Sequence, residues 1–229
     1  MKIHLKRKSN LLILLITFLI SPYSFSSDLW PNGIVKYRFE EDVPKITRRD
    51  FKRATRRWGE SEYISFEEVS KSYLKPHSII FYSSDGGCIS FIGYDENDSP
   101  PMWLSDRCYY SIILHEIGHL LGLRHEHQRS DRDKHIVFNT DFLIKHTYSE
   151  NNIFSTHDQL IGPYDQYSIM HYGEYVVPGM DDQYEVQTIH FKDKEKLFIP
   201  ETQRDLTKSD FKKIEILYRI NNVQRLHNK

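Results

Sequence analysis

Residues 115–125 read His115-Glu116-Ile117-Gly118-His119-Leu120-Leu121-Gly122-Leu123-Arg124-His125. In a helix, residues four apart differ by about 40° in azimuth and about 6 Å in height, so His115 and His119 can present their imidazoles to one ion. Imidazole nitrogen is a suitable ligand for zinc. The carboxylate of Glu116 can reach a water held by the metal without being a ligand, as a general base must. The stretch therefore predicts a zinc-binding helix that also carries a base.

The third histidine of this stretch requires the helix to end. In a continuous helix His125 would lie about 240° around the axis from His119 and roughly 9 Å further along it. Gly122 is the residue type that permits a left-handed exit from a helix. We therefore expect a turn at Gly122 that returns His125 to the metal as a third ligand, which leaves a coordination position open for water.

The full pattern is more specific than its first half. With 12 His in 229 residues, a His-Glu-x-x-His motif would arise by chance in roughly 4 of 100 shuffled chains. When Gly122 and His125 are also required at their fixed offsets, the chance occurrence falls to roughly 1 in 10,000 shuffled chains. The alternative is a helix whose histidines are ordinary surface residues.

The rest of the chain indicates one catalytic unit, because it contains no repeats or Pro/Gly-rich linkers. Apolar periodicity predicts strands and helices around the motif. We expect strands at 34–39, 64–69, 78–82 and 88–94, and helices at 47–58 and from Cys108 or Tyr109 to Leu121. A last helix, capped by Thr207 or Ser209, would bury an apolar stripe of Phe211, Ile214, Leu217 and Tyr218.

The N-terminus has the pattern of a signal peptide. Four basic residues precede the apolar run Leu11–Ile20, and small residues follow at Ser24, Ser26 and Ser27. The alternative is an uncleaved anchor, but ten helical residues rise only about 15 Å against a hydrocarbon core of roughly 30 Å. We therefore expect residues 1–26 to be a signal peptide, and the protein to be secreted or extracytoplasmic with no stable membrane insertion after cleavage.

Charge and cysteine content restrict the partners and the compartment. The charged residues among residues 1–26 are all basic, so the chain without them is more acidic than the formal net charge of −1. This argues against nucleic acid as a partner. The two cysteines are Cys88 and Cys108. In an exported protein they favour a disulfide that closes a loop of about 20 residues and contributes roughly 3 kcal/mol, with two reduced thiols as the alternative.

The run from His115 through Glu126, Arg129, Asp131, Arg132 and Asp133 resembles the astacin family of metzincin zinc metalloendopeptidases. Three further stretches are similar to segments of the same family. The stretch Ser168-Ile169-Met170-His171-Tyr172, with the preceding Tyr164-Asp165, resembles its Met-turn. Trp30-Pro31-Asn32-Gly33 resembles its mature start, and Leu206 to Tyr218 resembles its closing helix.

The resemblance implies an α+β fold with two lobes. The catalytic domain would span 27–229, with an N-terminal lobe at about 27–122 that holds a mixed β-sheet and two helices. The C-terminal lobe, at about 123–229, would be mostly irregular with a final helix. The substrate would bind as an extended strand along the segment Cys88 to Tyr94. We expect a monomer that binds one zinc ion per chain and acts on proteins or peptides.

The resemblance also implies roles for single residues. Met170 would lie beneath the zinc site as packing, and Tyr172 would stabilise the transition state, although from the residues alone Tyr172 is core or surface. Glu126 would belong to a buried network with the mature N-terminus, although the N-terminal arm of this chain is short. His127 is a possible extra ligand, but three histidines and a water already satisfy zinc. Cys88 and Cys108 match one family disulfide.

Together these features predict a secreted zinc endopeptidase in which Glu116 activates a water bound to the metal. Compared with the family pattern, we expect no propeptide, no second disulfide and no accessory module, and this suggests a bacterial enzyme, periplasmic or extracellular. The alternatives are a non-catalytic zinc-binding or adhesive protein on the same scaffold, and a different metzincin or non-proteolytic metal hydrolase.

Overall fold

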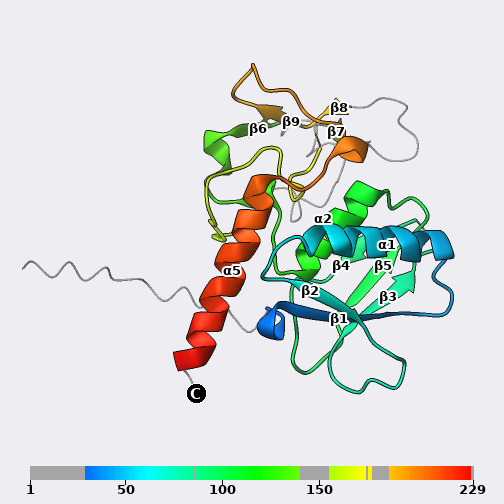
Figure 1. Ribbon diagram of the computed structural model, residues 1–229. Coiled ribbons are helices and arrows are strands. Elements are labelled where there is room, and N and C mark those ends of the chain that lie inside the picture. The colour runs from blue at the N-terminus through cyan, green and yellow to red at the C-terminus, as the bar shows by residue number, and fades with distance from the viewer. Residues whose placement is uncertain (1–28, 85, 140–154, 174, 177–185, 228–229) are drawn as a thin grey trace, which may run out of the picture.

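The computed structural model describes residues 29–84, 86–139, 155–173, 175–176 and 186–227. The expected signal peptide, residues 1–26, lies outside this part of the chain. Figure 1 shows two halves, one built on the larger sheet and the other on the short strands β6 to β9, with helix α5 running along both.

A five-stranded sheet with the order β2-β1-β3-β5-β4 forms the N-terminal half. Its strands are β1 (Ile34–Phe39), β2 (Ser65–Glu68), β3 (Ser78–Tyr82), β4 (Ile89–Ser90) and β5 (Pro101–Leu104). Strands β2, β1, β3 and β5 pair in parallel, whereas β4 pairs antiparallel to β5 and ends the sheet. The predicted mixed sheet is thus confirmed, with an antiparallel edge strand.

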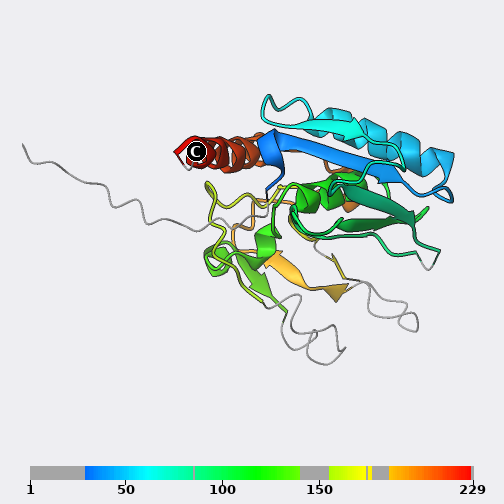
Figure 2. The same ribbon diagram turned by 90° about the horizontal axis from the view of Figure 1, so that it is seen from below.

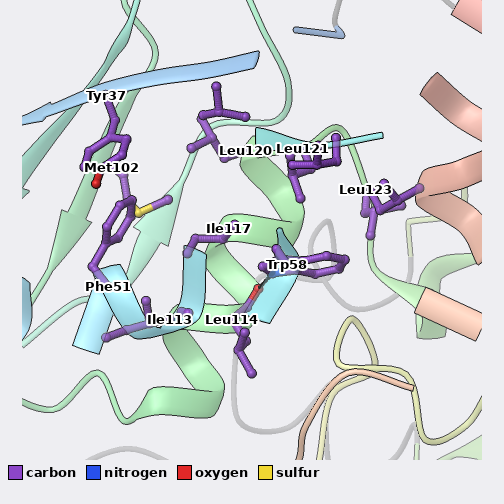
Figure 3. Close-up of a cluster of buried hydrophobic side chains, with 14 of the residues drawn as sticks. Tyr37, Phe51, Trp58, Met102, Ile113, Leu114, Ile117, Leu120, Leu121 and Leu123 are labelled. Atoms are coloured by element: carbon purple, nitrogen blue, oxygen red, sulfur yellow. Dashed lines mark hydrogen bonds between the residues drawn. The ribbon is translucent and has the colours of Figure 1, made fainter. Parts of the chain in front are cut away.

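Two helices cover this sheet, α1 (Lys45–Trp58) and α2 (Tyr110–Leu120). Along β1 every second side chain is buried, and the ring of Tyr37 packs 4.9 Å from that of Phe51 in α1. The indole of Trp58 donates a hydrogen bond to the carbonyl of Leu114 in α2 at 3.0 Å. Figure 3 shows these side chains in one cluster with Ile113, Ile117 and Leu120. The core therefore fixes the helix that carries the motif.

The C-terminal half has little regular structure among the described residues. Strand β6 (Ile136–Phe138) pairs antiparallel with β9 (Ile189–Phe191), and β7 (Tyr175–Val176) with β8 (Val186–Gln187). Its described residues also form the short 3-10 turns η2 (Glu126–Gln128), η3 (Arg132–Lys134) and η4 (Glu201–Gln203), whereas η1 (Pro31–Gly33) precedes β1 in the other half. A second apolar cluster around Ile136, Ile189 and Phe191 holds this half together. The predicted α+β fold with an irregular second lobe is confirmed.

The final helix α5 (Lys208–His227) joins the two halves. The Thr207 hydroxyl caps it by accepting from the Asp210 amide at 3.1 Å, while Asp210 accepts from the Thr207 amide at 2.9 Å. Ile214, Leu217 and Tyr218 are buried as predicted, with Phe211 packed partly against them. Figures 1 and 2 both show the N-terminal segment at η1 beside α5.

The sequence predictions differ from the structure mainly at the sheet edge. Strands β1 and β3 have the expected bounds, but only Ile89–Ser90 of the run 88–94 forms a strand. Strand β5 was missed, because it begins at the second of two prolines, residue types that usually exclude a strand interior. No helix in the described part of the chain is long and apolar enough to cross a membrane.

Candidate active site

Helix α2 ends at Leu120, and the turn that follows it lies at Gly122, where the sequence predicts one. This glycine has φ +94°, the left-handed conformation that suits glycine. Its amide donates to the carbonyl of His119 at 2.8 Å, and the amide of Leu123 donates to that of Gly118 at 2.9 Å. This pair of hydrogen bonds is a Schellman motif, which closes the helix and reverses the chain toward His125.

The reversal brings the three histidines together. Nε2 of His125 lies 3.1 Å from Nε2 of His115 and 3.0 Å from Nε2 of His119. Within the described residues these side chains form a group in which one nitrogen of each lies within 4.8 Å of the others. The imidazoles of two helical residues and of one loop residue therefore converge on one point.

Each of these imidazoles is held at its other nitrogen. Nδ1 of His115 donates to the carbonyl of Ile169 at 2.7 Å, and Nδ1 of His119 donates to that of Leu123 at 2.8 Å. Nδ1 of His125 donates to the side-chain oxygen of Gln128 at 3.0 Å. A neutral histidine that donates through Nδ1 has a lone pair at Nε2, which is the tautomer that binds a metal through Nε2.

The electrostatics of the three histidines also suit a cation. Removal from water, and then the neighbouring imidazoles, lower the pKa of His115, His119 and His125 to about 3 each. All three are therefore neutral near pH 7 and have lone pairs available. Three convergent imidazole nitrogens with fixed tautomers fit zinc, and they leave a fourth position for water or substrate.

Glu116 lies beside the three histidines, in a cleft. Its side chain is 6% exposed. Together with the histidines it lines a cavity of about 440 Å³ whose other walls are Cys88, Ile89, Ser90, Ile112 and Tyr172. The cavity thus places the edge strand β4 next to the predicted base.

Tyr172 lies against two of the predicted ligands. Its ring centroid is 4.6 Å from that of His125 and 6.2 Å from that of His115. On another side its ring stacks on His127 at 4.1 Å, and its amide donates to Nδ1 of His127 at 3.3 Å. His127 is fully buried beneath Tyr172, so it supports the tyrosine and was missed in that role by sequence reasoning.

Met170 is buried against the helix that carries His115 and His119. The side chain is 1% exposed, and its sulfur lies so close to helix α2 that a Cβ at Gly118 would be 2.3 Å away. Gly118 precedes His119, so the methionine packs directly beneath the ligand-bearing turn. The absence of a side chain at Gly118 allows this approach.

Glu126 is buried in a network of charged and polar groups. One carboxylate oxygen accepts from the amide of Asp165 at 2.8 Å and lies 3.2 Å from Nη1 of Arg129. The other lies 2.6 Å from Nζ of Lys213. Burial raises the pKa of Glu126, against the opposing effect of Lys213. The residues before 29, where a terminal contact would originate, lie outside the described part of the chain.

The sequence did not predict Lys213 as a partner of Glu126, although a signal existed. Asp210 and Lys213 are spaced three apart on the face of α5 that carries Leu217. Charged residues on an apolar face are usually paired in the folded protein. Apart from the cap at Thr207, their partners could not be named, because Ser168 and Glu126 lie in loops more than 40 residues away.

A disulfide joins Cys88 and Cys108, with their Cα atoms 5.9 Å apart. It connects the start of β4 to the residues before α2. The predicted bridge is thus confirmed, and it ties the cleft wall to the ligand helix.

Comparison with known proteins agrees with this geometry. Residues 23–219 match the family model Astacin, which describes a peptidase family. Astacin-like metalloprotease toxin 2 of Loxosceles intermedia is 31% identical over 195 residues, which cover 82% of this chain and 73% of the toxin. The dorsal-ventral patterning protein tolloid of Drosophila melanogaster is 34% identical over 148 residues, which cover 63% of this chain.

Two solved structures are similar in fold. High choriolytic enzyme 1, a hatching enzyme zinc-protease from Oryzias latipes, superposes with a TM-score of 0.69 at 26% identity, covering 85% of this chain and 96% of that one. Myroilysin superposes with a TM-score of 0.61, covering 84% of this chain and 96% of its own, and its 21% identity supports the fold alone.

The relatives differ in length from this chain, which spans 14% of tolloid and 52% of nematocyst expressed protein 6 of Nematostella vectensis. The activities of those whole proteins are therefore not carried over. The family match covers most of the chain, and the three histidines converge as zinc ligands must. The chain belongs to the astacin family of peptidases.

Proposed function

We propose that this chain is a secreted endopeptidase that uses one zinc ion to hydrolyse peptide bonds in proteins. The observation that carries the proposal is the convergence of three Nε2 atoms beside a buried glutamate in an open cleft. The zinc-protease and metalloprotease relatives support the same activity. The basic and apolar N-terminal segment and the disulfide support secretion.

His115, His119 and His125 would hold the zinc, which when bound would lower the pKa of a water and polarise a substrate carbonyl. Glu116 takes the proton from the attacking water and gives it to the leaving amine, so that one carboxylate acts first as base and then as acid. The hydroxyl of Tyr172 donates a hydrogen bond to the carbonyl oxygen as negative charge develops on it.

The edge strand β4 would hold the substrate. It is the last strand of the sheet and pairs with β5 on one side, while Ile89 and Ser90 line the cavity. An extended peptide that pairs with the outer side of β4 would run past the three histidines. This mode of binding recognises the peptide backbone, which is consistent with an enzyme that acts on proteins.

Replacing Glu116 with Gln tests the proposal. The amide has nearly the same shape but cannot take a proton, so we expect bound zinc at the wild-type level and cleavage of a denatured protein lowered by at least about 100-fold. Zinc content and product formation are measured on the same preparation. Full hydrolysis by this variant would refute the role of Glu116, and wild-type protein that holds zinc but cleaves nothing would favour a binding protein.

A further inference from the structure

Helix α5 presents two charged side chains to the interior of the protein. Asp210 is 0% exposed and Lys213 is 4% exposed, although charged residues are rarely buried without a partner. Both reach loops of the C-terminal half that carry or support the zinc ligands. The contacts of Lys213 connect most directly to His125.

Lys213 pairs with the residue that follows the third histidine. Its Nζ lies 2.6 Å from Oε2 of Glu126, and both side chains are 5% exposed. Arg129 also lies near Glu126, but its guanidinium is bound at 2.9 Å by each oxygen of Asp131. Lys213 therefore supplies the main charge compensation for Glu126 among these groups.

Glu126, held by Lys213, also makes hydrogen bonds to two loops around the site. Its carboxylate accepts from the amide of Asp165, and its own amide donates to the carbonyl of Met170 at 2.9 Å. Three turns of chain thus meet at one residue: the turn that holds His125, the loop at Asp165 and the loop at Met170.

Asp210 acts on the same region one turn earlier in α5. It accepts from the Ser168 hydroxyl at 2.5 Å and from the amide of Ile169 at 3.0 Å. The carbonyl of that same Ile169 accepts the hydrogen bond from Nδ1 of His115. One face of α5 therefore restrains segments next to two different ligands.

We propose that Lys213 is a positioning residue of the zinc site, which holds the Glu126 turn, and with it His125, where the third imidazole meets the other two. The proposal rests on the proposed function of the three histidines as zinc ligands. Without the ammonium, the buried carboxylate would have to find water or another donor. The turn would then shift, and Nε2 of His125 would leave the position that it shares with His115 and His119.

The test compares zinc binding by Lys213→Met, Lys213→Arg and the control Lys212→Met, each in the purified protein. Lys212 neighbours Lys213 in α5, but its side chain is 60% exposed and pairs with Glu215. The zinc dissociation constant is measured by competition with a chelator. The visible spectrum of the cobalt-substituted protein reports the ligand geometry.

Loss of an outer partner of a metal ligand typically costs 10- to 100-fold in affinity. We therefore expect Lys213→Met to bind zinc roughly 10- to 100-fold more weakly and to have an altered cobalt spectrum. Lys213→Arg should recover most of both properties, and Lys212→Met should match the wild type. Wild-type affinity and spectrum in folded Lys213→Met would overturn the proposal.

If Lys213→Met does not fold, the double variant Glu126→Gln, Lys213→Met takes its place in the test. The double variant removes both buried charges, so neither is left without a partner. Weakened zinc binding by this folded double variant supports the positioning role, and wild-type affinity overturns it. Zinc binding is measured without substrate. A wild-type protein that binds zinc but cleaves nothing would therefore contradict the proposed function and still allow this comparison to be made.

Discussion

The three histidines show how far sequence reasoning reaches at the scale of the residue. Their spacing and the glycine at 122 were sufficient to predict that they meet, and the structure brings their Nε2 atoms together. The Nδ1 partner of His115 could not be predicted, because the carbonyl of Ile169 lies 54 residues from His115 in the sequence. Every residue has a backbone carbonyl, so the residue types do not indicate which carbonyl accepts this hydrogen bond. Only the packing of the loops in the structure shows it.

Replacing Tyr172 with Phe tests the role proposed for its hydroxyl. The ring would still stack on His127, so we expect an unchanged zinc dissociation constant and a kcat lowered by about 100-fold, as for loss of one oxyanion donor. Steady-state kinetics on a peptide substrate measures the effect. Tyr167→Phe is the matched control, since Tyr167 belongs to the same aromatic cluster. A wild-type kcat in Tyr172→Phe would mean that the hydroxyl takes no part in the reaction.

At the scale of the element, helices were easier to predict than strands. Helices α1 and α2 carry a 3.6-residue apolar period and end within two residues of the expected positions. Strand β5 lies between β3 and β4, yet Pro100 and Pro101 concealed it. Its first residue can be proline because the ladder needs no donor there. The parallel pairings of this sheet depend on contacts distant in sequence, which local patterns do not encode.

The disulfide joins the residue just before the edge strand β4 to the segment that leads into helix α2. Replacing Cys88 and Cys108 together with Ser frees a loop of about 20 residues, so we expect the free energy of unfolding to fall by about 3 kcal/mol. We also expect KM for an extended peptide to rise, because Ile89 and Ser90 would be held less firmly beside the histidines. Denaturant unfolding and steady-state kinetics check the two effects. Unchanged stability and KM together would show that the bridge supports neither the fold nor the cleft.

At the scale of the whole molecule, residues near the start and near the end of the described chain both contact the C-terminal end of α2. The Trp30 indole donates to the carbonyl of Leu120 at 2.8 Å, and the Tyr218 hydroxyl donates to that of Leu121 at 3.1 Å. These carbonyls end α2 and have no partner within the helix. Trp30 and Tyr218, almost 190 residues apart in the sequence, thus supply the hydrogen bonds that the last carbonyls of α2 lack.

Buried histidines make the stability of the metal-free protein dependent on pH. Burial lowers the pKa of His115, His119, His125 and His171 to about 3, from 6.5. The unfolded chain therefore binds more protons between these values, so stability is full above pH 6.5 and falls as the pH drops toward 3. Between these two pKa values, each histidine lowers the free energy of unfolding by up to about 1.4 kcal/mol for each pH unit of acidification.

Denaturant unfolding of the metal-free protein between pH 7.5 and pH 5 measures this effect, with the pH values chosen around the ordinary pKa of histidine, about 6.5. Burial raises the pKa of Glu126 and Asp210, which acts in the opposite direction, but the histidines outnumber them. We expect the free energy of unfolding to decrease steadily on acidification. A constant or rising stability would show that the histidines are not neutral in the folded protein.

The most direct test of the account is to titrate zinc into the metal-free protein while cleavage of a denatured protein is measured. The account predicts no hydrolysis without metal, and a rate that rises linearly and reaches its plateau at about one zinc per chain. Full hydrolysis by the metal-free protein, or none with one zinc bound, would contradict it.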